Sequence, residues 1–454
     1  MNFNPEIFRE YDIRGLAKEE LTPELVAALG KAFGFYIIKN GGKKIAIGRD
    51  NRPSSERISG NLVEGIISTG LDVVDVGLVP TPVLYYAVNT LEVNGGAMVT
   101  ASHNPPEFNG FKLLAGKDAL FGEQIQEIRE IIERGEFPKG NGKLSEKNVD
   151  AGYVGEIKKH IKLKKGLKVV LDCGNGVAGP MAVKVLEEIG TEVVPLYCEM
   201  DGSFPNHLPD PTQENLMQDL INRVKKENAD LGIGIDGDGD RIGVVTAKGE
   251  IVWGDKLLAL YSREVLEKNP GATIVFEVKC SQLLPEEIER LGGNPLMYKT
   301  GHSLIKAKMK EINAKLAGEM SGHMFFADGW FGFDDAIYSS ARLLQILSGS
   351  GKNLGEIVRE MPKYYSSPEI RLDCPDDAKF KVVEKIREIF REKYEIIDID
   401  GARVLFGDGW GLVRASNTQP KIIVRYEAKS EERLSEIKEI METELRKFKE
   451  IKFG

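Results

Sequence analysis

The chain has 454 residues, with 61 Lys and Arg against 70 Asp and Glu, which gives a formal net charge of −9. Because a single hydrophobic core rarely grows past about 250–300 residues, this length predicts three or four domains. The content of 42% hydrophobic and 29% charged residues is typical of a globular protein and excludes a disordered or membrane-embedded chain. The negative charge argues against nucleic-acid binding, since a phosphate backbone would be repelled. These numbers favour chemistry on small molecules.

The cysteines and the N-terminal segment indicate the compartment. Cys173, Cys198, Cys280 and Cys374 show neither the density of a disulfide framework nor the CxxC spacing of a zinc site. The first residues carry charges where a signal peptide requires an apolar core, and no apolar run reaches the roughly 18 residues of a membrane span. The sequence therefore predicts a cytoplasmic protein that does not enter the membrane.

One supersecondary pattern occurs three times along the chain. Each copy has an apolar strand, a turn, an amphipathic helix that ends at glycine, and a second apolar strand; the copies begin at 44–50, 167–176 and 272–280. Strands without polar alternation that are joined by helices are typical of parallel sheets covered on both faces. The pattern predicts a βαβ unit in each of three α/β domains, although three unrelated αβ segments are the alternative.

Changes in composition indicate where the domains join. The segment 139–152 is rich in Gly and Lys, and 361–370 holds two prolines and adjacent serines, so both are predicted to be linkers. Beyond these segments, alternating strands at 402–406 and 421–427 precede a last helix at about 430–447. This order predicts a smaller α+β domain at the end of the chain.

The first segment with candidate chemistry is 98–112. It follows a short apolar run and holds Ser102, His103 and Asn104 before two prolines. Because prolines stiffen a loop, the hydroxyl of Ser102 could be held at the end of a strand as a nucleophile. An ordinary turn is the alternative, since only His103 is available nearby to activate the serine.

The second segment places Asp236, Asp238 and Asp240 in alternation with glycines after an apolar strand. Three carboxylates that converge on one point repel each other, and a hard divalent cation would remove that repulsion. A calcium EF-hand would need Gly and Glu where Arg241 and Ala247 stand. The spacing therefore favours a magnesium site at a strand end over a calcium loop or a solvated acidic turn.

Two later loops carry groups suited to a phosphorylated sugar. A carboxylate, a hydroxyl and an imidazole, which can hydrogen-bond sugar hydroxyls, lie among glycines in 317–323. A guanidinium, two hydroxyls and an amide, which can bind phosphate, lie in 414–425 with a second arginine one strand along. Either loop could instead be a polar turn. The residues concerned are Glu319, Ser321, His323, Arg414, Ser416, Asn417, Thr418 and Arg425.

A glycine triplet supports a different function. Gly174, Gly176 and Gly179 follow a strand and precede a helix, and Glu199 lies 20 residues beyond the last of them, as in dinucleotide-binding proteins. An NAD-dependent dehydrogenase is therefore an alternative. Asp172 argues against it, because its charge would lie near a pyrophosphate, and nothing else in the sequence indicates hydride chemistry.

The motifs TASHNP, DGDGDR, GEMSGH and RASNT together match one enzyme family. Over essentially its whole length the chain resembles the α-D-phosphohexomutases, most closely their phosphomannomutase/phosphoglucomutase group. The resemblance implies three related α/β domains and a smaller α+β domain in a heart-shaped arrangement around a central cleft. We expect the domains at 1–150, 151–252, 253–368 and 369–454 to supply the phosphoserine, metal-binding, sugar-binding and phosphate-binding loops in turn.

The resemblance also implies an activity. The enzyme would move phosphate reversibly between C1 and C6 of mannose and glucose phosphates, through a phosphoserine at Ser102 and a hexose 1,6-bisphosphate that acts as intermediate and activator. Mg²⁺ would be bound by Ser102, Asp236, Asp238 and Asp240. A phosphoglucosamine mutase is the alternative within the family, although Met320 and the phosphate-loop sequence favour glucose and mannose. A phosphatase-like hydrolase would also use a serine and a metal.

Residue-by-residue matching to the family implies further roles. Tyr11 and Arg14 in YDIRG, and Lys112 at the end of FNGFK, would lie near the reacting hydroxyl. Glu319 and Ser321 would bind sugar hydroxyls, and His323 would lie beside the phosphoserine. Lys112 and His323 are the candidate proton acceptors, with Arg14 in an orienting role. The remaining expected substrate contacts are Arg241, Lys279, His302, Arg414, Ser416, Asn417, Thr418 and Arg425.

Overall fold

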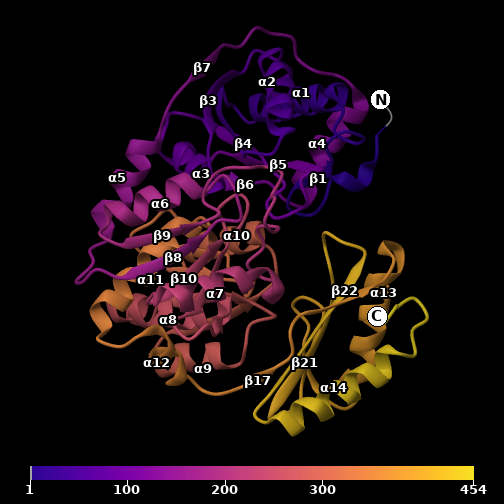
Figure 1. Cartoon of the computed structure of the whole chain (residues 1–454). Helices are drawn as coiled ribbons and strands as arrows, with labels where there is room; N and C mark the ends of the chain where they lie inside the picture. Colours follow the sequence, from indigo (N-terminus) through magenta and orange to yellow (C-terminus); the bar gives the residue numbers. More distant parts are fainter. Residues whose placement is uncertain (1–2, 454) are drawn as a thin grey trace.

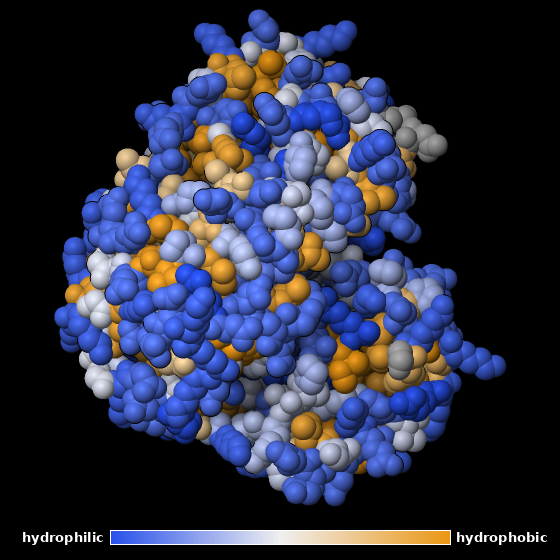
Figure 2. All heavy atoms as spheres, viewed as in Figure 1, coloured by the Kyte–Doolittle hydropathy of each residue, from blue (hydrophilic) through white to orange (hydrophobic). Residues whose placement is uncertain are grey.

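The computed structural model describes residues 3–453, and in them the strands form four separate sheets. In Figure 1 the first sheet and its helices lie at the top, the second and third domains lie together below, and the fourth domain stands at the lower right. The surface is hollowed between the first and fourth domains (Figure 2). This arrangement confirms the four-domain α/β architecture implied by the resemblance.

The first domain has the sheet order β1-β5-β4-β2-β3-β7, with β6 paired to β5. Its predicted βαβ unit is β2, α2 and β3, whose strands pair in parallel, and β4 lies parallel to β2 on the other side. The serine loop therefore leaves the carboxyl edge of this sheet. The elements are a 3-10 helix Pro5–Ile7, β1 Ile13–Leu16, α1 Pro23–Lys39, β2 Lys44–Arg49, α2 Ser55–Ile67, β3 Asp72–Leu78, α3 Thr81–Thr90, β4 Gly95–Val99, β5 Phe108–Ala115, β6 Asp118–Ala119, α4 Glu123–Arg134 and β7 Leu144–Glu146.

The second domain has the order β12-β11-β10-β8-β9. Strands β8 and β9 flank α6 and pair in parallel, which confirms the second βαβ unit. Strand β10 lies parallel to β8, so the aspartate loop leaves the same edge as the glycine triplet. The elements are α5 Asp150–His160, β8 Lys168–Asp172, α6 Gly179–Glu188, β9 Glu192–Leu196, a 3-10 helix Glu214–Met217, α7 Gln218–Glu227, β10 Leu231–Ile235, β11 Ile242–Thr246 and β12 Ile251–Val252.

The third domain has the order β14-β13-β15-β16. Strands β13 and β14 flank α9 and pair in parallel, which confirms the third unit, and the sugar loop follows β15. The elements are α8 Gly254–Lys268, β13 Thr273–Glu277, α9 Leu283–Arg290, β14 Asn294–Tyr298, α10 His302–Ile312, β15 Leu316–Gly318, β16 Met324–Phe326, α11 Ala336–Ser350 and α12 Leu354–Arg359.

The fourth domain is the predicted α+β unit, with an antiparallel sheet in the order β17-β22-β21-β20-β19 and β18 paired to β22. Helices α13 and α14 cover it, and the apolar face of α14 buries Ile437, Met441 and Leu445. The elements are β17 Tyr365–Ser366, β18 Ile370–Asp373, α13 Asp376–Arg391, β19 Glu395–Ile397, β20 Ala402–Leu405, β21 Gly409–Ala415, β22 Lys421–Ala428 and α14 Glu431–Leu445.

Both predicted linkers contain a short strand. Within 139–152, β7 pairs in parallel with β3, and within 361–370, β17 pairs with β22. Both are short edge strands that pair through their backbones, and all three residues of β7 are exposed. An edge strand exposed on both faces needs no apolar alternation, so its sequence does not differ from that of a loop.

The hydrophobic cores show which domains form one body. One continuous core joins α3 of the first domain to the second and third domains, whereas the fourth domain has a separate core. Within residues 3–453, the buried apolar cluster that connects the third and fourth domains is small and consists of Val278, Trp410 and Leu412. The fourth domain is thus packed less extensively on its neighbours. Among residues 3–453, no helix is both long and apolar enough to cross a membrane.

Candidate active site

The serine loop begins just after β4, and Ser102 lies in it with a φ of 53°. The left-handed region is unusual for a residue with a Cβ and costs about 1–3 kcal/mol unless the surroundings enforce it. Here the backbone N–H of Ser102 donates to Thr100 Oγ1 at 2.9 Å. The hydroxyl of Ser102 donates to Asp236 Oδ2 at 2.8 Å and lies 3.1 Å from His103 Nδ1. The serine of the first domain therefore contacts the aspartate loop of the second.

The aspartate loop connects β10 to β11, and its three carboxylates are fully buried. Oδ1 of Asp236 accepts the backbone N–H groups of residues 239, 240 and 241 at 3.0–3.1 Å. Burial and the charges of Asp240 and Asp238 hold the pKa of Asp236 well above its usual value. The loop thus places two carboxylates where their charges make ionisation of Asp236 more difficult.

Lys112 of β5 lies against this loop and is buried. Its ammonium donates to Asp238 Oδ2 at 2.6 Å and also contacts Asp240 Oδ2. Burial alone would lower the pKa of Lys112, but the two carboxylates outweigh it and hold the pKa well above its usual value. Lys112 is therefore a cation in this structure.

The aspartate loop fits a divalent cation. One carboxylate oxygen from each of the three aspartates lies within 4.8 Å of the others. Oδ1 of Asp238 and Oδ1 of Asp240 are buried without a hydrogen-bond partner, while Lys112 supplies only one positive charge. Oxygen ligands of this kind suit a hard cation such as Mg²⁺. A bound ion would satisfy the free oxygens and reduce the repulsion.

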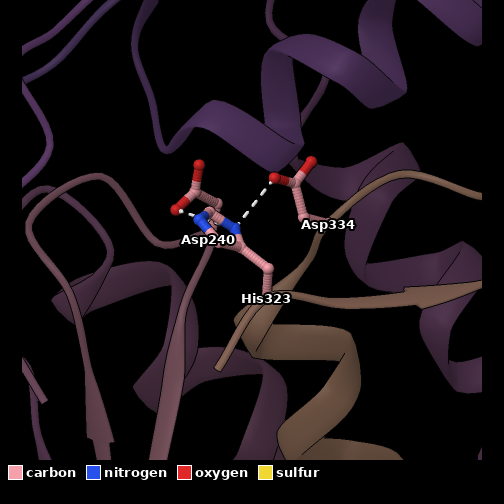
Figure 3. A group of neighbouring side chains, drawn as sticks. All are labelled: Asp240, His323 and Asp334. Atoms are coloured by element: carbon pink, nitrogen blue, oxygen red, sulfur yellow. Dashed lines mark ion pairs between the residues drawn. The ribbon is translucent and has the colours of Figure 1, made fainter. Parts of the chain in front are cut away.

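His323 is the last residue of the sugar loop and faces two carboxylates (Figure 3). Its Nδ1 lies 3.0 Å from Asp334 Oδ2 and 3.6 Å from Asp240 Oδ1. Its Nε2 accepts a hydrogen bond from Arg241 Nε at 2.9 Å. Because Nε2 is an acceptor, the ring proton is on Nδ1, between the carboxylates. These three side chains could also hold a metal, but an imidazole N–H between two carboxylates accounts for the grouping.

Asp334 was not singled out from the sequence. It is fully buried, receives Lys306 Nζ at 2.8 Å, and lies 3.4 Å from Nδ1 of His302. The rings of His302 and His323 stack with centroids 5.3 Å apart. One carboxylate therefore faces both predicted histidines of the site. The adjacent acidic pair Asp334–Asp335 in an aromatic segment was the only signal for it in the sequence.

The sugar loop holds Glu319 through two hydrogen bonds. Glu319 accepts the backbone N–H of Gly301 at 2.8 Å and the hydroxyl of Ser321 at 2.8 Å. Lys279, after β13, donates to Glu369 at 2.9 Å, where the chain enters the fourth domain. These residues of the third domain therefore lie between the aspartate loop and the fourth domain.

The phosphate loop of the fourth domain contacts the other domains. Nδ2 of Asn417 donates to the hydroxyl of Tyr11 at 2.5 Å, and that hydroxyl donates to the carbonyl of Thr300 at 2.8 Å. Arg414 Nε donates to Asp400 Oδ2 at 3.0 Å, while its Nη2 is buried without a partner. Ser416 and Thr418 lie in the same turn, joined by a hydrogen bond of 3.4 Å. A donor with no partner in this loop is available to a phosphate.

Most of the predicted residues are brought together. Arg14 is among them, because it donates to Asn104 of the serine loop at 2.7 Å.

Arg425 lies at the interface between two domains. Its guanidinium is buried between the third and fourth domains, 3.4 Å from Asp255, and also donates to the carbonyl of Lys279. In this arrangement Arg425 joins the fourth domain to the third.

The glycine triplet has a packing role. A Cβ on Gly176 would lie 2.7 Å from the carbonyl oxygen of Gly237, and one on Gly179 would lie 2.1 Å from that of Cys198. The carboxylate of Asp172 accepts the N–H of Gly174 at 3.0 Å. These contacts explain the glycines by close backbone packing beneath the aspartate loop, so they do not indicate a dinucleotide site.

Comparison with known proteins shows the family. Models of the family described as phosphoglucomutase/phosphomannomutase match alpha/beta/alpha domain I at residues 5–139, domain II at 151–249, domain III at 253–365 and the C-terminal domain at 369–444. The chain is 48% identical to a phosphomannomutase/phosphoglucomutase of Pseudomonas aeruginosa over 97% of this chain and 95% of the relative. It is 43% identical to a phosphoglucomutase of Neisseria gonorrhoeae over 95% of each.

A solved structure is similar throughout. A phosphoglucomutase/phosphomannomutase family protein from Burkholderia thailandensis superposes with a TM-score of 0.94 at 42% identity, covering 98% of both chains. The fold and the site, a serine beside an acidic loop at the junction of four domains, define a mutase. The chain belongs to the phosphoglucomutase/phosphomannomutase family.

Proposed function

We propose that the protein interconverts hexose 1-phosphates and 6-phosphates through a phosphoserine at Ser102. The contact between Ser102 Oγ and Asp236 Oδ2 carries this proposal, because it joins a nucleophile to a predicted metal loop from another domain. Relatives named phosphomannomutase/phosphoglucomutase support the same activity. Transfer from Ser102 to O6 of a hexose 1-phosphate would form a 1,6-bisphosphate, and the reoriented sugar would return its other phosphate to the serine.

The metal proposed for this reaction is Mg²⁺. Asp236, Asp238, Asp240 and an oxygen of the phosphorylated Ser102 would hold it. When bound, it would stabilise the negative charge of the transferred phosphoryl group. Lys112 adds a positive charge at the same place, which matters because phosphoserine carries about −1.5 to −2 charges at pH 7 and would otherwise repel a second phosphate.

The opposite end of the substrate needs a binding site that accepts either orientation. Arg414, Ser416, Asn417 and Thr418 are proposed to hold the phosphate that is not being transferred, with the free Nη2 of Arg414 as a donor. Tyr11, Arg241, Lys279 and His302 are proposed to line the space between this loop and the serine. Arg425 is proposed to contribute through the interface that positions the fourth domain.

Glu319 and Ser321 are proposed to bind the sugar hydroxyls O3 and O4. These hydroxyls have the same configuration in glucose and mannose, so contacts to them do not distinguish the two sugars. We expect turnover of both hexose phosphates. A turnover of glucosamine 6-phosphate that exceeds both by tenfold would favour the phosphoglucosamine mutase instead.

The proton acceptor is proposed to be Lys112 or His323, with Arg14 orienting the reacting group. Lys112 is held as a cation by two carboxylates, and His323 has its acceptor nitrogen on Arg241. Either group must change its present state to accept a proton: Lys112 must first lose its own, and Nε2 of His323 must release Arg241. The kinetics of Lys112→Met and His323→Ala test the two candidates.

Intact mass measures the phosphoserine directly. Addition of a hexose 1,6-bisphosphate should raise the mass of the protein by about 80 Da, and the Ser102→Ala variant should show no increase. Release of inorganic phosphate faster than formation of the isomer would indicate the phosphatase-like hydrolase. Absence of any mass change, with no isomer formed, would contradict the proposed function.

The domain limits and the cellular location are also proposals. Domain limits at 1–150, 151–252, 253–368 and 369–454 are supported by the four family matches, although β17 already pairs with the fourth sheet. A cytoplasmic location is supported by the four cysteines, which are all buried free thiols.

A further inference from the structure

The serine loop is held by an arginine to which the family resemblance gave no role. Arg52 lies between β2 and α2 and is 2% exposed. Its guanidinium donates to four backbone carbonyls of the serine loop and its exit into β5. These belong to Ser102 at 2.7 Å, Asn104 at 2.6 Å, Pro105 at 2.6 Å and Phe108 at 3.1 Å.

All five N–H groups of the Arg52 guanidinium donate hydrogen bonds. A guanidinium carries five N–H groups, and the fifth, on Nε of Arg52, donates to Asp50 Oδ2 at 3.1 Å. Asp50 also supplies the opposite charge that a buried guanidinium requires. Phe204 of the second domain covers the guanidinium, with its ring centroid 5.0 Å away. The arginine is therefore fully paired, buried and anchored independently of the loop that it holds.

The carbonyl of Ser102 is held on two sides. Arg52 donates to it, and Gly237 of the aspartate loop packs so closely that a Cβ there would lie 2.3 Å from the same oxygen. Ser102 has the left-handed backbone conformation that residues with a Cβ rarely adopt. A strained conformation persists only where its surroundings impose it. Arg52 supplies the hydrogen bonds that do so.

We infer that Arg52 is a positioning residue for phosphoryl transfer: it holds the serine loop so that Ser102 Oγ points at Asp236 and not away from it. The inference rests on the proposed function of Ser102. Without the guanidinium, four carbonyls in and beside the loop each lose a hydrogen bond, and the loop is free to leave the strained conformation. The substrate contacts on the third and fourth domains remain, so binding changes less than turnover.

Arg52→Lys tests the inference, because it keeps the charge but offers at most three N–H donors in place of five. We expect kcat and the rate of Ser102 phosphorylation by hexose 1,6-bisphosphate to fall by about 100-fold, as for a small misplacement of a reacting group. KM should stay within about threefold of wild type, because the contacts that bind the substrate and the transition state equally well are unchanged. Turnover within twofold of wild type would overturn the inference.

Chemical rescue separates positioning from general destabilisation. Arg52→Ala leaves a buried cavity beside Asp50, and added guanidinium ion at low millimolar concentration should restore part of its kcat. Absence of rescue in a variant that melts as wild type does would contradict the inference. If Arg52→Ala does not fold, the kinetics of Arg52→Lys decide alone.

Arg57 provides a matched control. It lies on α2, and its guanidinium donates to the carbonyls of Ala17 at 2.6 Å and Leu21 at 3.2 Å, away from the serine loop. Arg57→Lys should keep wild-type kcat, and a loss equal to that of Arg52→Lys would overturn the inference. Wild-type protein measured in parallel separates failure of the proposed function from failure of the positioning role. If wild type neither takes up phosphate nor forms isomer, the proposed function is wrong. If wild type is active and Arg52→Lys has the same turnover, only the positioning role is wrong.

Discussion

Ser102 Oγ of the first domain lies 2.8 Å from Asp236 Oδ2 of the second, although 134 residues separate them in the chain. Asp236 is at the same time destabilised by burial and by its two neighbouring carboxylates, which raise its pKa. The contact therefore places a serine hydroxyl beside a carboxylate whose charge is costly without a cation. The thermal stability of the metal-free protein and its response to Mg²⁺ should therefore depend on Asp236.

Asp236→Asn should raise the melting temperature of the metal-free protein by a few degrees at neutral pH. Asparagine can keep the three backbone hydrogen bonds on Oδ1 and donate to Ser102, while the repulsive charge is removed. Added Mg²⁺ should stabilise the variant less than wild type. Thermal melts with a chelator and with Mg²⁺ measure both effects. Asp118→Asn, at an exposed ion pair with Lys310, is the control, and an equal Mg²⁺ response in all three proteins would refute the expected role of Asp236.

Asp335 should make the stability depend on pH. Burial raises its pKa to about 7, even though Tyr153 and the N–H of Tyr338 donate to it. The folded protein thus keeps a proton on Asp335 that the unfolded chain loses near pH 4. The stability contribution is full below about pH 4, and the unfolding free energy then falls by about 1.4 kcal/mol per pH unit until about pH 7, where the loss is complete.

Urea unfolding of wild type and Asp335→Asn between pH 4 and pH 8 measures this dependence. Asparagine does not titrate, so the difference between the two proteins should change across that window, in favour of the variant as pH rises. The total change is on the order of 4 kcal/mol. A difference that is constant with pH would show that Asp335 titrates normally.

Lys112→Met and His323→Ala test the proposed acid–base chemistry. Each should lower kcat by about 100-fold or more, the usual effect of losing a positioned proton-transfer group or a charge that stabilises the transition state. Steady-state turnover of glucose 1-phosphate measures it. Lys308→Met, which removes an ion pair with Glu311 one turn along α10 and a cation–π contact with Tyr298, should have no effect. If both active-site variants stay within twofold of wild type, neither residue is the proton acceptor.

Tyr11→Phe should loosen the fourth domain. The hydroxyl of Tyr11 links Asn417 of the fourth domain to Thr300 of the third, and a neutral hydrogen bond contributes about 1 kcal/mol. We expect KM to rise by about fivefold and amide hydrogen exchange to increase in 414–420. Tyr197→Phe is the control, since its hydroxyl bonds Asp219 within the second domain. Unchanged KM and exchange in Tyr11→Phe would show that the link does not position the domain.

The structure confirms the predicted elements whose apolar residues recur at a regular spacing in the local sequence. The three βαβ units and the last helix were visible because their apolar residues recur at strand or helix spacing. Strands β7 and β17 were missed because they are short edges that depend on pairing with a remote strand. Their existence depends on β3 and β22, which lie far away in the chain, so no window of sequence around them contains the signal.

The residues of the candidate site also fall into two groups: those in local sequence motifs and those that act through contacts distant in sequence. Ser102, the three aspartates and the residues of the two later loops lie in compact motifs that could be read directly. Arg52 and Asp334 were missed because each acts on groups distant in sequence: Arg52 on carbonyls of the serine loop, and Asp334 on two histidines. Arg425 was read as a phosphate ligand, but the structure pairs it with Asp255 across the domain interface.

The sequence by itself determined the number and type of the domains, their βαβ units and the chemical groups available in each loop, because these depend on residue types and spacings within a few turns of chain. Only the tertiary structure decided which groups meet. It placed Ser102 against Asp236, Lys112 between two carboxylates, and Asn417 on Tyr11. Such distances follow from how sheets and domains pack, which is a property of contacts between remote segments and leaves no local periodicity in the sequence.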